Sequence, residues 1–391
     1  MASLADAGSR PIYLAGVAET ALGEVHDETE YSMFAKASME ALGEAGLTLD
    51  DVDGLFLNYM GEEGTVQVGE YLGLHDVRYL DSTDSGGSAF ELFVHHAMLA
   101  VAEGRCNVAL IGYASRQRTR RMRTMADWTG RDTYSLGAQF QAPYGIPMPI
   151  GHYAMMAARH MHQYGTTSEQ LAEIAVAANQ WAQLNPKAWR HGKTIDVDDV
   201  LDSAMMCDPL HKLDCCLVTD GGGAIVLTSG DRAKDAAKTP IRVLGAGESQ
   251  THWHLAQMRD LTATAAQLSG REAFGMAGIT PADVDVFQPY DSFTITVLKA
   301  LEDLGFCEQG EGGAFVEKGR LAPGGDLPAM TSGGGLSYNH PGALGALLLV
   351  EAVRQLRGEA GDRQVPGAQI AVAHGVGGFM STAGTVVMAR E

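Results

Sequence analysis

The sequence predicts an α/β protein made of two similar halves, because two stretches repeat along the chain and short apolar strands follow long helices. Residues 41–59 match residues 273–291 at an offset of 232, and each copy reads as a helix end, a glycine turn and a strand. Farther along each half, a glycine-rich loop opens a long apolar helix that ends in glycine and leads into a buried strand, and Ala89 matches Ala343 at an offset of 254. Two βαβ-type halves of duplicated topology are the simplest explanation.

The apolar patterns of these elements predict burial on more than one face. The segments VALIG, AIVLTS, QIAVAHG and GTVVMA are short, apolar and rich in β-branched residues, which is typical of strands covered on both faces. The two helices lie within DSGGSAFELFVHHAMLAVAEG and YNHPGALGALLLVEAVRQLRG, and their apolar residues continue around nearly every face. We therefore expect central helices that are sandwiched between sheets.

Residues 116–204 have no counterpart in the second half, so we expect an inserted loop domain there. This segment contains an arginine-rich run, a stretch rich in Gly and Pro, and two helices, HYAMMAARHMHQYG and SEQLAEIAVAANQWAQLNP, the second with Thr167 or Ser168 as its N-cap. The expected division of the chain is an N-terminal half of residues 1–115 and 205–230, the loop domain of residues 116–204, and a C-terminal half of residues 236–391.

Composition and charge argue against several classes of binding partner and site. The 391 residues include 28 Lys and Arg against 48 Asp and Glu, and the net charge of −20 has the wrong sign for general nucleic-acid binding. The five cysteines form no C-x-x-C pair and no Cys/His cluster with zinc spacing, so we expect a reduced, cytoplasmic location and no metal site in this chain. We expect neither a targeting segment nor a membrane span.

Four motifs distributed over the chain carry a resemblance to a known family. They are HQYGTTSEQLAEIAVAANQWAQLNPKAW, CDPLHKLDCCLVTDGGGAIVL, GGGLSYNHPGALG and AHGVGGFMSTAGTVVM. Together with the duplicated halves, they make the chain resemble the thiolase superfamily over essentially its whole length, in the branch of sterol carrier protein x and the lipid-transfer proteins. The resemblance implies a thiolase-like fold in which the two halves form a five-layered αβαβα arrangement with an inserted loop domain.

The nucleophile position of the family is where the sequence departs from thiolases. A degradative thiolase carries a cysteine at the N-terminus of the first buried helix, where the helix dipole lowers the pKa of the thiol. In the matching stretch DSTDSGGSAF this position falls on Asp84, and no cysteine lies within twenty residues. Asp84 cannot form an acyl-thioester and reads as a helix cap, and Ser85 would need a base that the resemblance does not place beside it. Claisen chemistry through an acyl-enzyme is therefore disfavoured.

The remaining catalytic loops of the family carry groups that suit a retro-aldol reaction. Such a reaction needs a base for the β-hydroxyl proton, donors for the thioester enolate and an acid, but no nucleophile. The loop PYDSF places Tyr290 at a catalytic position, and the loop SYNHP places Tyr338 two residues before His340. In this pattern the chain resembles the cysteine-less thiolase-like aldolases of steroid side-chain degradation. The resemblance implies Tyr290 and Tyr338 as the acid/base pair, with either tyrosine in either role.

Neighbouring residues are expected to support this pair. A tyrosine pKa of about 10 leaves little phenolate at neutral pH, so Tyr290 would need His340 or a hydrogen-bond relay beside it. His340 precedes Pro341 at an expected helix N-terminus, which suits a neutral hydrogen-bond donor to the enolate. His374 with Gly375 would form a second donor cluster, and Asp291 would orient the loop of Tyr290.

Five arginines form a basic run in this acidic chain: Arg116, Arg118, Arg120, Arg121 and Arg123. Arginine suits the geometry of phosphate, and CoA carries phosphates, so binding of CoA is one interpretation of the run. Docking of a partner and an ordinary solvated face are the other two.

The expected function is an aldolase, a carbon–carbon lyase that cleaves a β-hydroxyacyl-CoA, with a steroid side-chain thioester as the expected substrate. The products would be a ketone or aldehyde and a short acyl-CoA, and the chain itself would need no cofactor. By resemblance we also expect a homodimer that binds a small zinc-ribbon/OB-fold protein, giving a heterotetramer in which the partner could hold zinc. Three alternatives stay open: a thiolase or acyltransferase that uses Ser85, a non-catalytic lipid-transfer or scaffold subunit, and an aldolase of aromatic thioesters.

Overall fold

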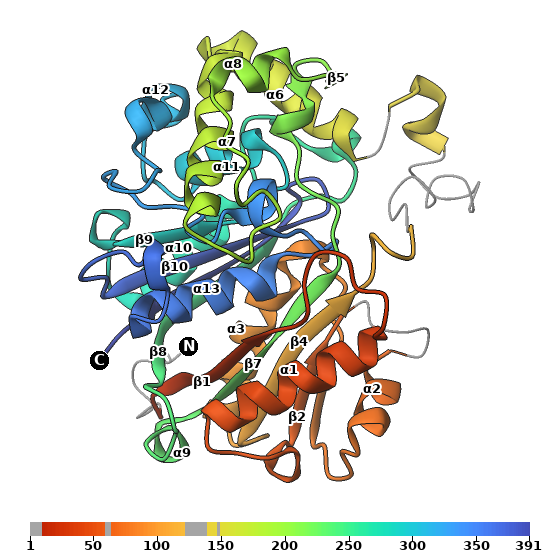
Figure 1. The fold of residues 1–391 in the computed structure, drawn as a ribbon, viewed down its shortest axis with the longest axis vertical. Helices are drawn as coiled ribbons and strands as arrows, with labels where there is room; N and C mark the ends of the chain where they lie inside the picture. The colour runs from red at the N-terminus through yellow and green to blue at the C-terminus, as the bar shows by residue number, and fades with distance from the viewer. Residues whose placement is uncertain (1–9, 59–63, 122–138, 147–148) are drawn as a thin grey trace.

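The computed structural model describes residues 10–58, 64–121, 139–146 and 149–391 (Figure 1). Within these ranges the strands form a nine-stranded mixed sheet in the order β3-β2-β4-β7-β1-β8-β11-β10-β9 and a separate two-stranded sheet. None of the helices in the described ranges is long and apolar enough to cross a membrane. The predicted α/β class is confirmed.

The N-terminal part of the large sheet contains five strands. Strand β2 is parallel to both β3 and β4, whereas β7 is antiparallel to both β4 and β1. Every residue of β4 and β7 is buried, as the apolar segments VALIG and AIVLTS predict. The bounds of these strands are β1, Ile12–Glu19; β2, Gly54–Leu57; β3, Tyr79–Asp81; β4, Val108–Ser115; and β7, Gly221–Ser229.

The C-terminal part of the sheet repeats the topology of four of these five strands, all but β3. The order β9-β10-β11-β8 matches β2-β4-β7-β1, and the first pair is again parallel and the next two antiparallel. The predicted duplication is therefore confirmed. The two parts join where Tyr13 and Leu14 of β1 pair with Arg242 and Ile241 of β8. The bounds are β8, Ile241–Gln250; β9, Val286–Pro289; β10, Ile370–Gly377; and β11, Thr382–Ala389.

The sequence repeat has a local physical cause, which is the same capped turn in both halves. The backbone N–H of Thr48 donates to Oδ2 of Asp51 at 3.0 Å, and that of Thr280 donates to Oδ2 of Asp283 at 2.8 Å. Each carboxylate thereby satisfies a backbone donor at the start of a short 3-10 turn that leads into a parallel strand.

Four helices, α1, α3, α10 and α13, arrange the sheet into layers. Helices α3 and α13 pack against each other and against strands of both halves, whereas α1 covers β1, β4 and β7, and α10 covers β8 and β11 (Figure 1). Nearly all residues of the two central helices are buried, as their sequences predict. The bounds are α1, Glu30–Glu44; α2, Thr65–Leu72; α3, Ala89–Ala102; α10, Ala266–Ala277; α11, Thr294–Asp303; and α13, Gly345–Arg357.

Further helices gather at one end of the molecule, beside the C-terminal half (Figure 1). Helix α7 packs against α8, α11 and α12, and its N-cap is Thr167, whose Oγ1 accepts from the backbone N–H of Gln170 at 3.3 Å. The bounds of the remaining named elements are α6, Ile150–Tyr164; α7, Ser168–Gln183; α8, Val197–Asp202; β5, Met205–Cys207; β6, Leu210–His211; α9, Gly230–Ala233; and α12, Gly312–Val316.

Buried charges lie at the contact between α6 and α11. Nε2 of His160 lies 3.0 Å from Oε1 of Glu302, and Nζ of Lys299 lies 2.6 Å from Oε2 of the same carboxylate. Burial alone would raise the pKa of Glu302, but His160 and Lys299 lower it below its ordinary value. This network ties α6 to the C-terminal half.

Candidate active site

Tyr290 lies at the end of β9, where the two halves of the molecule meet. Its backbone N–H donates to the carbonyl oxygen of His374 at 2.8 Å, which continues the parallel pairing of β9 with β10. Its ring lies on Gly87, in the turn that opens α3, and a Cβ at Gly87 would lie 2.4 Å from Cε2 of Tyr290. Its hydroxyl lies 3.1 Å from Nε2 of His340, and both residues are buried. The structure therefore brings these two sequence-predicted residues together.

Burial determines the protonation of this pair. It lowers the pKa of His340 to about 4, so the imidazole is neutral at pH 7 and its Nε2 can accept a hydrogen bond from the hydroxyl of Tyr290. Burial raises the pKa of Tyr290 well above its ordinary value, and the backbone N–H of Leu344 opposes this shift only in part.

Helix α13 begins at Gly345 and not at Pro341, because the backbone at Gly342 has a φ of +96°.

The loop that carries His340 is held from two sides. On one side, the carboxylate of Asp291 accepts from the backbone N–H groups of Gly335 and Leu336 at 2.6 and 3.0 Å, although burial raises the pKa of Asp291 to about 7. On the other side, the backbone N–H of His340 donates to Oγ1 of Thr219 at 2.8 Å. Asp291 thus orients a loop, and the loop is the one that supplies His340.

Tyr338 points away from the Tyr290–His340 pair. Its hydroxyl donates to Oε2 of Glu19 at 2.6 Å, and the same oxygen accepts from Nη1 of Arg354 in α13 at 2.7 Å. Burial and the charge of Glu19 raise the pKa of Tyr338 well above its ordinary value. The hydroxyls of the two sequence-predicted tyrosines are therefore engaged in different networks.

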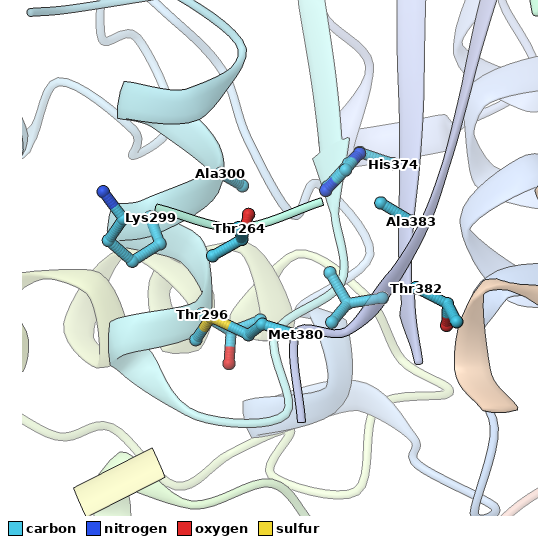
Figure 2. A pocket seen from close by; sticks show the side chains of 9 residues that line it. Thr264, Thr296, Lys299, Ala300, His374, Met380, Thr382 and Ala383 are labelled. Atoms are coloured by element: carbon cyan, nitrogen blue, oxygen red, sulfur yellow. The ribbon is translucent and has the colours of Figure 1, made fainter. Parts of the chain in front are cut away.

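His374 and Gly375 lie on opposite faces of β10. Nδ1 of His374 lies 2.9 Å from Oγ1 of Thr385, and the ring lines a cavity together with Thr264 and with Lys299 and Ala300 of α11 (Figure 2). Gly375 faces α3 instead, because side chains alternate along a strand and a Cβ at Gly375 would lie 2.0 Å from Oε2 of Glu91.

Two consequences follow for the donor cluster expected at His374 and Gly375. Burial lowers the pKa of His374 to about 3, so the ring is neutral. It faces the outer helix layer and is not brought together with Tyr290 and His340. The backbone of Gly375 pairs with Gly384 in the sheet ladder. The sequence motif gives the order of these residues along β10 but no information about which face each residue presents.

Asp84 and Ser85 lie before the turn that opens α3. Asp84 is exposed, and its pKa is raised by partial desolvation, which a hydrogen bond from Asn58 opposes. Ser85 is buried, and its carbonyl oxygen accepts from the hydroxyl of Thr382 at 2.7 Å. Its own Oγ has no hydrogen-bond partner among the described residues. A serine nucleophile needs a base within hydrogen-bond reach, and the described part of the chain provides none for Ser85.

The side chains of three of the four described members of the arginine run contact protein groups. Nε of Arg116 donates to the carbonyl oxygen of Val25 at 3.1 Å, Nε of Arg118 lies 3.0 Å from Oε2 of Glu24, and Nε of Arg120 lies 3.1 Å from Oε1 of Glu30. Arg121 is exposed. Arg123 lies outside the described residues. Only some of the arginine side chains of the run are therefore available to bind an anionic ligand.

Sequence reasoning missed two tyrosines that border the pair. The hydroxyl of Tyr153 in α6 donates to the carbonyl oxygen of Gly378 at 3.0 Å, and that of Tyr113 in β4 donates to the carbonyl oxygen of Pro341 at 2.8 Å. Both lie in apolar segments whose patterns indicate only packing, so no sequence signal distinguishes them.

Across the described ranges, no group of three or more His, Cys, Asp or Glu side chains could hold a metal ion.

Comparisons with known proteins give relatives over the whole chain. A family model described as thiolase C-terminal domain-like matches residues 247–390. The chain is 34% identical to an acetyl-CoA acetyltransferase of Methanothermobacter thermautotrophicus, over 97% of this chain and 100% of the relative. It is also 34% identical to the 17-hydroxy-3-oxo-4-pregnene-20-carboxyl-CoA lyase of Mycobacterium tuberculosis, over 88% of this chain and 91% of that protein. Among solved structures it is similar to an Ltp2-ChsH2(DUF35) aldolase, with a TM-score of 0.88 and 31% identity, over 97% of this chain and 98% of that one.

Proposed function

The chain belongs to the thiolase superfamily, in the branch of sterol carrier protein 2 and the Ltp2-like proteins, and we propose that it is an aldolase that cleaves a β-hydroxyacyl-CoA by a retro-aldol reaction. The observation that carries this proposal is the buried contact between the hydroxyl of Tyr290 and Nε2 of His340. It lies beside the opening of α3, where the nucleophile position of the family holds Asp84. Such a site can move protons but has no thiolate at that position to form an acyl-enzyme.

The proposed reaction transfers one proton from oxygen to carbon. Tyr290 takes the β-hydroxyl proton of the substrate as its own proton passes to Nε2 of the neutral His340. The bond between the α- and β-carbons then breaks, which gives a ketone or aldehyde and a thioester enolate. The pair returns the proton to the α-carbon of the enolate, so the enzyme ends in its starting state. Backbone N–H groups where α3 and α13 begin would stabilise the enolate oxygen.

The substrate class rests on the relatives. Two proteins that cover most of this chain are named for cleavage of steroid side chains or for a steroid carboxyl-CoA lyase activity, at 32 and 34% identity. We therefore propose a steroid side-chain CoA thioester as the substrate, with an aromatic thioester as the nearest competitor. Within the arginine run, the exposed Arg120 and Arg121 are the members that we propose for the phosphates of CoA.

The proposed assembly also follows from the resemblance. We propose a cytoplasmic homodimer that binds a small zinc-ribbon/OB-fold protein. The similar solved structure is a complex that includes a DUF35 protein, which supports a partner of that kind. The Tyr290–His340 pair needs no cofactor for the proposed reaction, and any zinc would belong to the partner.

An acyltransferase is the second candidate, because a relative of equal identity carries the name acetyl-CoA acetyltransferase. That activity would need a covalent acyl group on Ser85 or on a cysteine. Cys216 lies near Tyr290, since its backbone N–H donates to the carbonyl oxygen of Ser292 at 2.9 Å, but burial raises the pKa of its thiol. Intact-mass measurement after incubation with acyl-CoA would detect a covalent acyl adduct. A stable adduct on the active enzyme would favour an acyltransferase over the proposed aldolase.

The function is tested by supplying β-hydroxyacyl-CoA thioesters with steroid or aromatic acyl groups, with and without a co-expressed DUF35 partner. Release of the ketone and of the shortened acyl-CoA is followed by chromatography and mass spectrometry. We expect the unaltered protein to cleave at least one of these thioesters and the Tyr290→Phe variant to lose this activity. Cleavage that persists in Tyr290→Phe would contradict the proposed mechanism.

A further inference from the structure

We propose that Glu19 is a positioning residue of the active site, which acts through the hydroxyl of Tyr338 to hold the loop that carries His340. The kinetic part of this inference rests on the proposed aldolase function, and its structural part does not. Glu19 ends β1 of the N-terminal half, 319 residues before Tyr338 in the chain, and lies outside every motif of the catalytic loops.

The carboxylate of Glu19 is buried and fully engaged. Its side chain is 6% exposed. Oε2 accepts from the hydroxyl of Tyr338 at 2.6 Å and from Nη1 of Arg354 at 2.7 Å, while Oε1 pairs with Nζ of Lys187. One anion therefore joins β1, α13, the catalytic loop and the segment after α7.

The charge of Glu19 decides between a proton relay and a fixed anchor. Burial alone would raise the pKa of Glu19, but Arg354, Lys187 and Tyr338 together lower it to about 2. A carboxylate with this pKa does not take up a proton near neutral pH, as a relay requires. The bond from Tyr338 to Glu19 is therefore an anchor with a fixed donor and a fixed acceptor.

The backbone beside Tyr338 shows how the anchor reaches His340. The carbonyl oxygen of Tyr338 accepts from the backbone N–H of Trp189 at 3.0 Å, and that of Ser337 accepts from Arg190 at 3.1 Å. Asp291 holds the same loop at Gly335 and Leu336, on the side that precedes Tyr338. Glu19 thus fixes the end of the loop that is two residues from His340. A displacement there changes the contact between His340 and Tyr290, and an error of about 1 Å in such a contact can cost about 100-fold in rate.

The chain offers a matched control with the same three groups at the surface. The hydroxyl of Tyr13 donates to Oε2 of Glu391 at 2.6 Å, and Oε1 of Glu391 pairs with Arg242. These groups lie on β1, at the C-terminal end of the chain and on β8, and the Arg242 and Glu391 side chains are 43 and 45% exposed. Glu391→Gln and Tyr13→Phe therefore remove the same chemistry from an exposed site beside the pairing of β1 with β8.

The kinetic experiment compares Glu19→Gln, Tyr338→Phe and their double variant in the assay for β-hydroxyacyl-CoA cleavage. We expect each single variant to lower kcat by about tenfold or more, with a smaller change in KM and an unchanged pH profile. The double variant should be no slower than the slower single variant, because both changes break one connection. Glu391→Gln and Tyr13→Phe should match the unaltered protein. The inference is overturned if Tyr338→Phe is as inactive as Tyr290→Phe while Glu19→Gln keeps full activity, because Tyr338 would then act on substrate directly.

Hydrogen–deuterium exchange supplies a readout that needs no substrate. The backbone amides of residues 333–340 should exchange faster in Glu19→Gln and in Tyr338→Phe than in the unaltered protein, and should not change in Tyr13→Phe. Unchanged exchange in both variants would overturn the inference even if the aldolase activity is established. If the unaltered protein cleaves no β-hydroxyacyl-CoA, the proposed function fails while the exchange experiment still decides the role of Glu19. Should Glu19→Gln not fold, Tyr338→Phe decides alone, because it leaves the Glu19–Arg354 pair intact.

Discussion

The hydroxyl of Tyr290 and Nε2 of His340 lie 3.1 Å apart, and the ring of Tyr290 rests on Gly87 of the other half of the molecule. The C-terminal half therefore supplies both groups of the proton-transfer pair, whereas the N-terminal half supplies the surface that positions one of them. This relationship separates residues that carry the proposed chemistry from residues that hold them in place.

Tyr290→Phe should lower kcat by about 10² to 10⁴-fold, because it removes a general acid/base from the pair while keeping the ring that packs on Gly87. Thermal unfolding of the variant should stay close to that of the unaltered protein. Steady-state kinetics with a cleaved β-hydroxyacyl-CoA measures the effect, with Tyr13→Phe as the control for loss of a tyrosine hydroxyl. A change in kcat of less than about threefold would exclude Tyr290 as the proton-transfer group.

The pH dependence of cleavage should reflect the buried state of His340. The pKa of His340 is lowered to about 4, so the ring stays neutral and able to accept a proton throughout the range from pH 5 to 8. Activity should therefore fall on the acid side near pH 4, and not near the ordinary histidine value of about 6.5. A profile of kcat/KM between pH 3.5 and 8 measures this, and His340→Gln should lose activity across the whole range. A kcat/KM profile whose acid limb is centred near pH 6.5 would contradict a neutral, buried His340.

Gly87→Ala should impair catalysis through the ring of Tyr290. A Cβ at this position would lie 2.4 Å from Cε2 of Tyr290 and 2.5 Å from the carbonyl oxygen of Val376, so the ring or the backbone must move. We expect kcat to fall by at least about tenfold. Gly43→Ala is the matched control, because a Cβ there meets nothing within 4 Å and the residue lies in α1. That variant should keep full activity and gain about 0.5 to 1 kcal/mol of stability. Equal kinetics of the two variants would show that Tyr290 does not depend on Gly87.

The duplicated fold could be predicted from sequence because its signals are local. The Thr48–Asp51 and Thr280–Asp283 turns each fix a strand start through a contact three residues long, so similar residues recur at a constant offset. The contact of Tyr290 with His340 could also be predicted from the sequence, since both residues lie in recognisable motifs and a buried tyrosine needs such a partner.

The rest of the site could not be predicted because it depends on contacts between distant segments. Whether the hydroxyl of Tyr338 meets Tyr290 or Glu19 is decided by a residue 319 positions away. The face that His374 presents is decided by the register of β10 against β11, where it pairs with Thr385. A motif fixes the order of residues along a loop, but it does not contain the direction of each side chain.

Stability should depend on pH through His96, which joins the two halves. Its imidazole pairs with Asp81 of β3 and, at 2.8 Å, with Glu248 of β8, and these carboxylates raise its pKa to about 9. A raised histidine pKa stabilises the folded state fully below the unfolded value of about 6.5, and this contribution is lost as the pH rises through 9. His96→Gln should therefore lower Tm by a few degrees at pH 6 and by much less at pH 10. The same difference in Tm at both pH values would mean that His96 is not charged in the folded protein.

Lys299→Met should destabilise the protein, because it removes the cation that pairs with two buried carboxylates of α11. Nζ of Lys299 lies 2.6 Å from Glu302 and 3.4 Å from Asp303, and all three side chains are almost wholly buried. Removing one partner of a buried ion pair costs about 3 to 5 kcal/mol. Lys36→Met is the control, since Lys36 pairs with Glu28 at 2.9 Å but is 65% exposed, and such a pair contributes about 0 to 1 kcal/mol.

The loss in Lys299→Met should also depend on pH, with a sign that identifies its cause. The lowered pKa of Glu302 means that its ionised form stabilises the fold above the ordinary glutamate pKa, and that this contribution is lost as the pH falls through the lowered value. Without Lys299 the pKa of Glu302 rises, so the carboxyl group becomes neutral at a higher pH and the penalty for its burial decreases in acid. Urea unfolding should therefore show a larger difference in stability between the variant and the unaltered protein at pH 8 than at pH 5. A difference that is independent of pH would mean that the variant acts through packing and not through the buried carboxylates of α11.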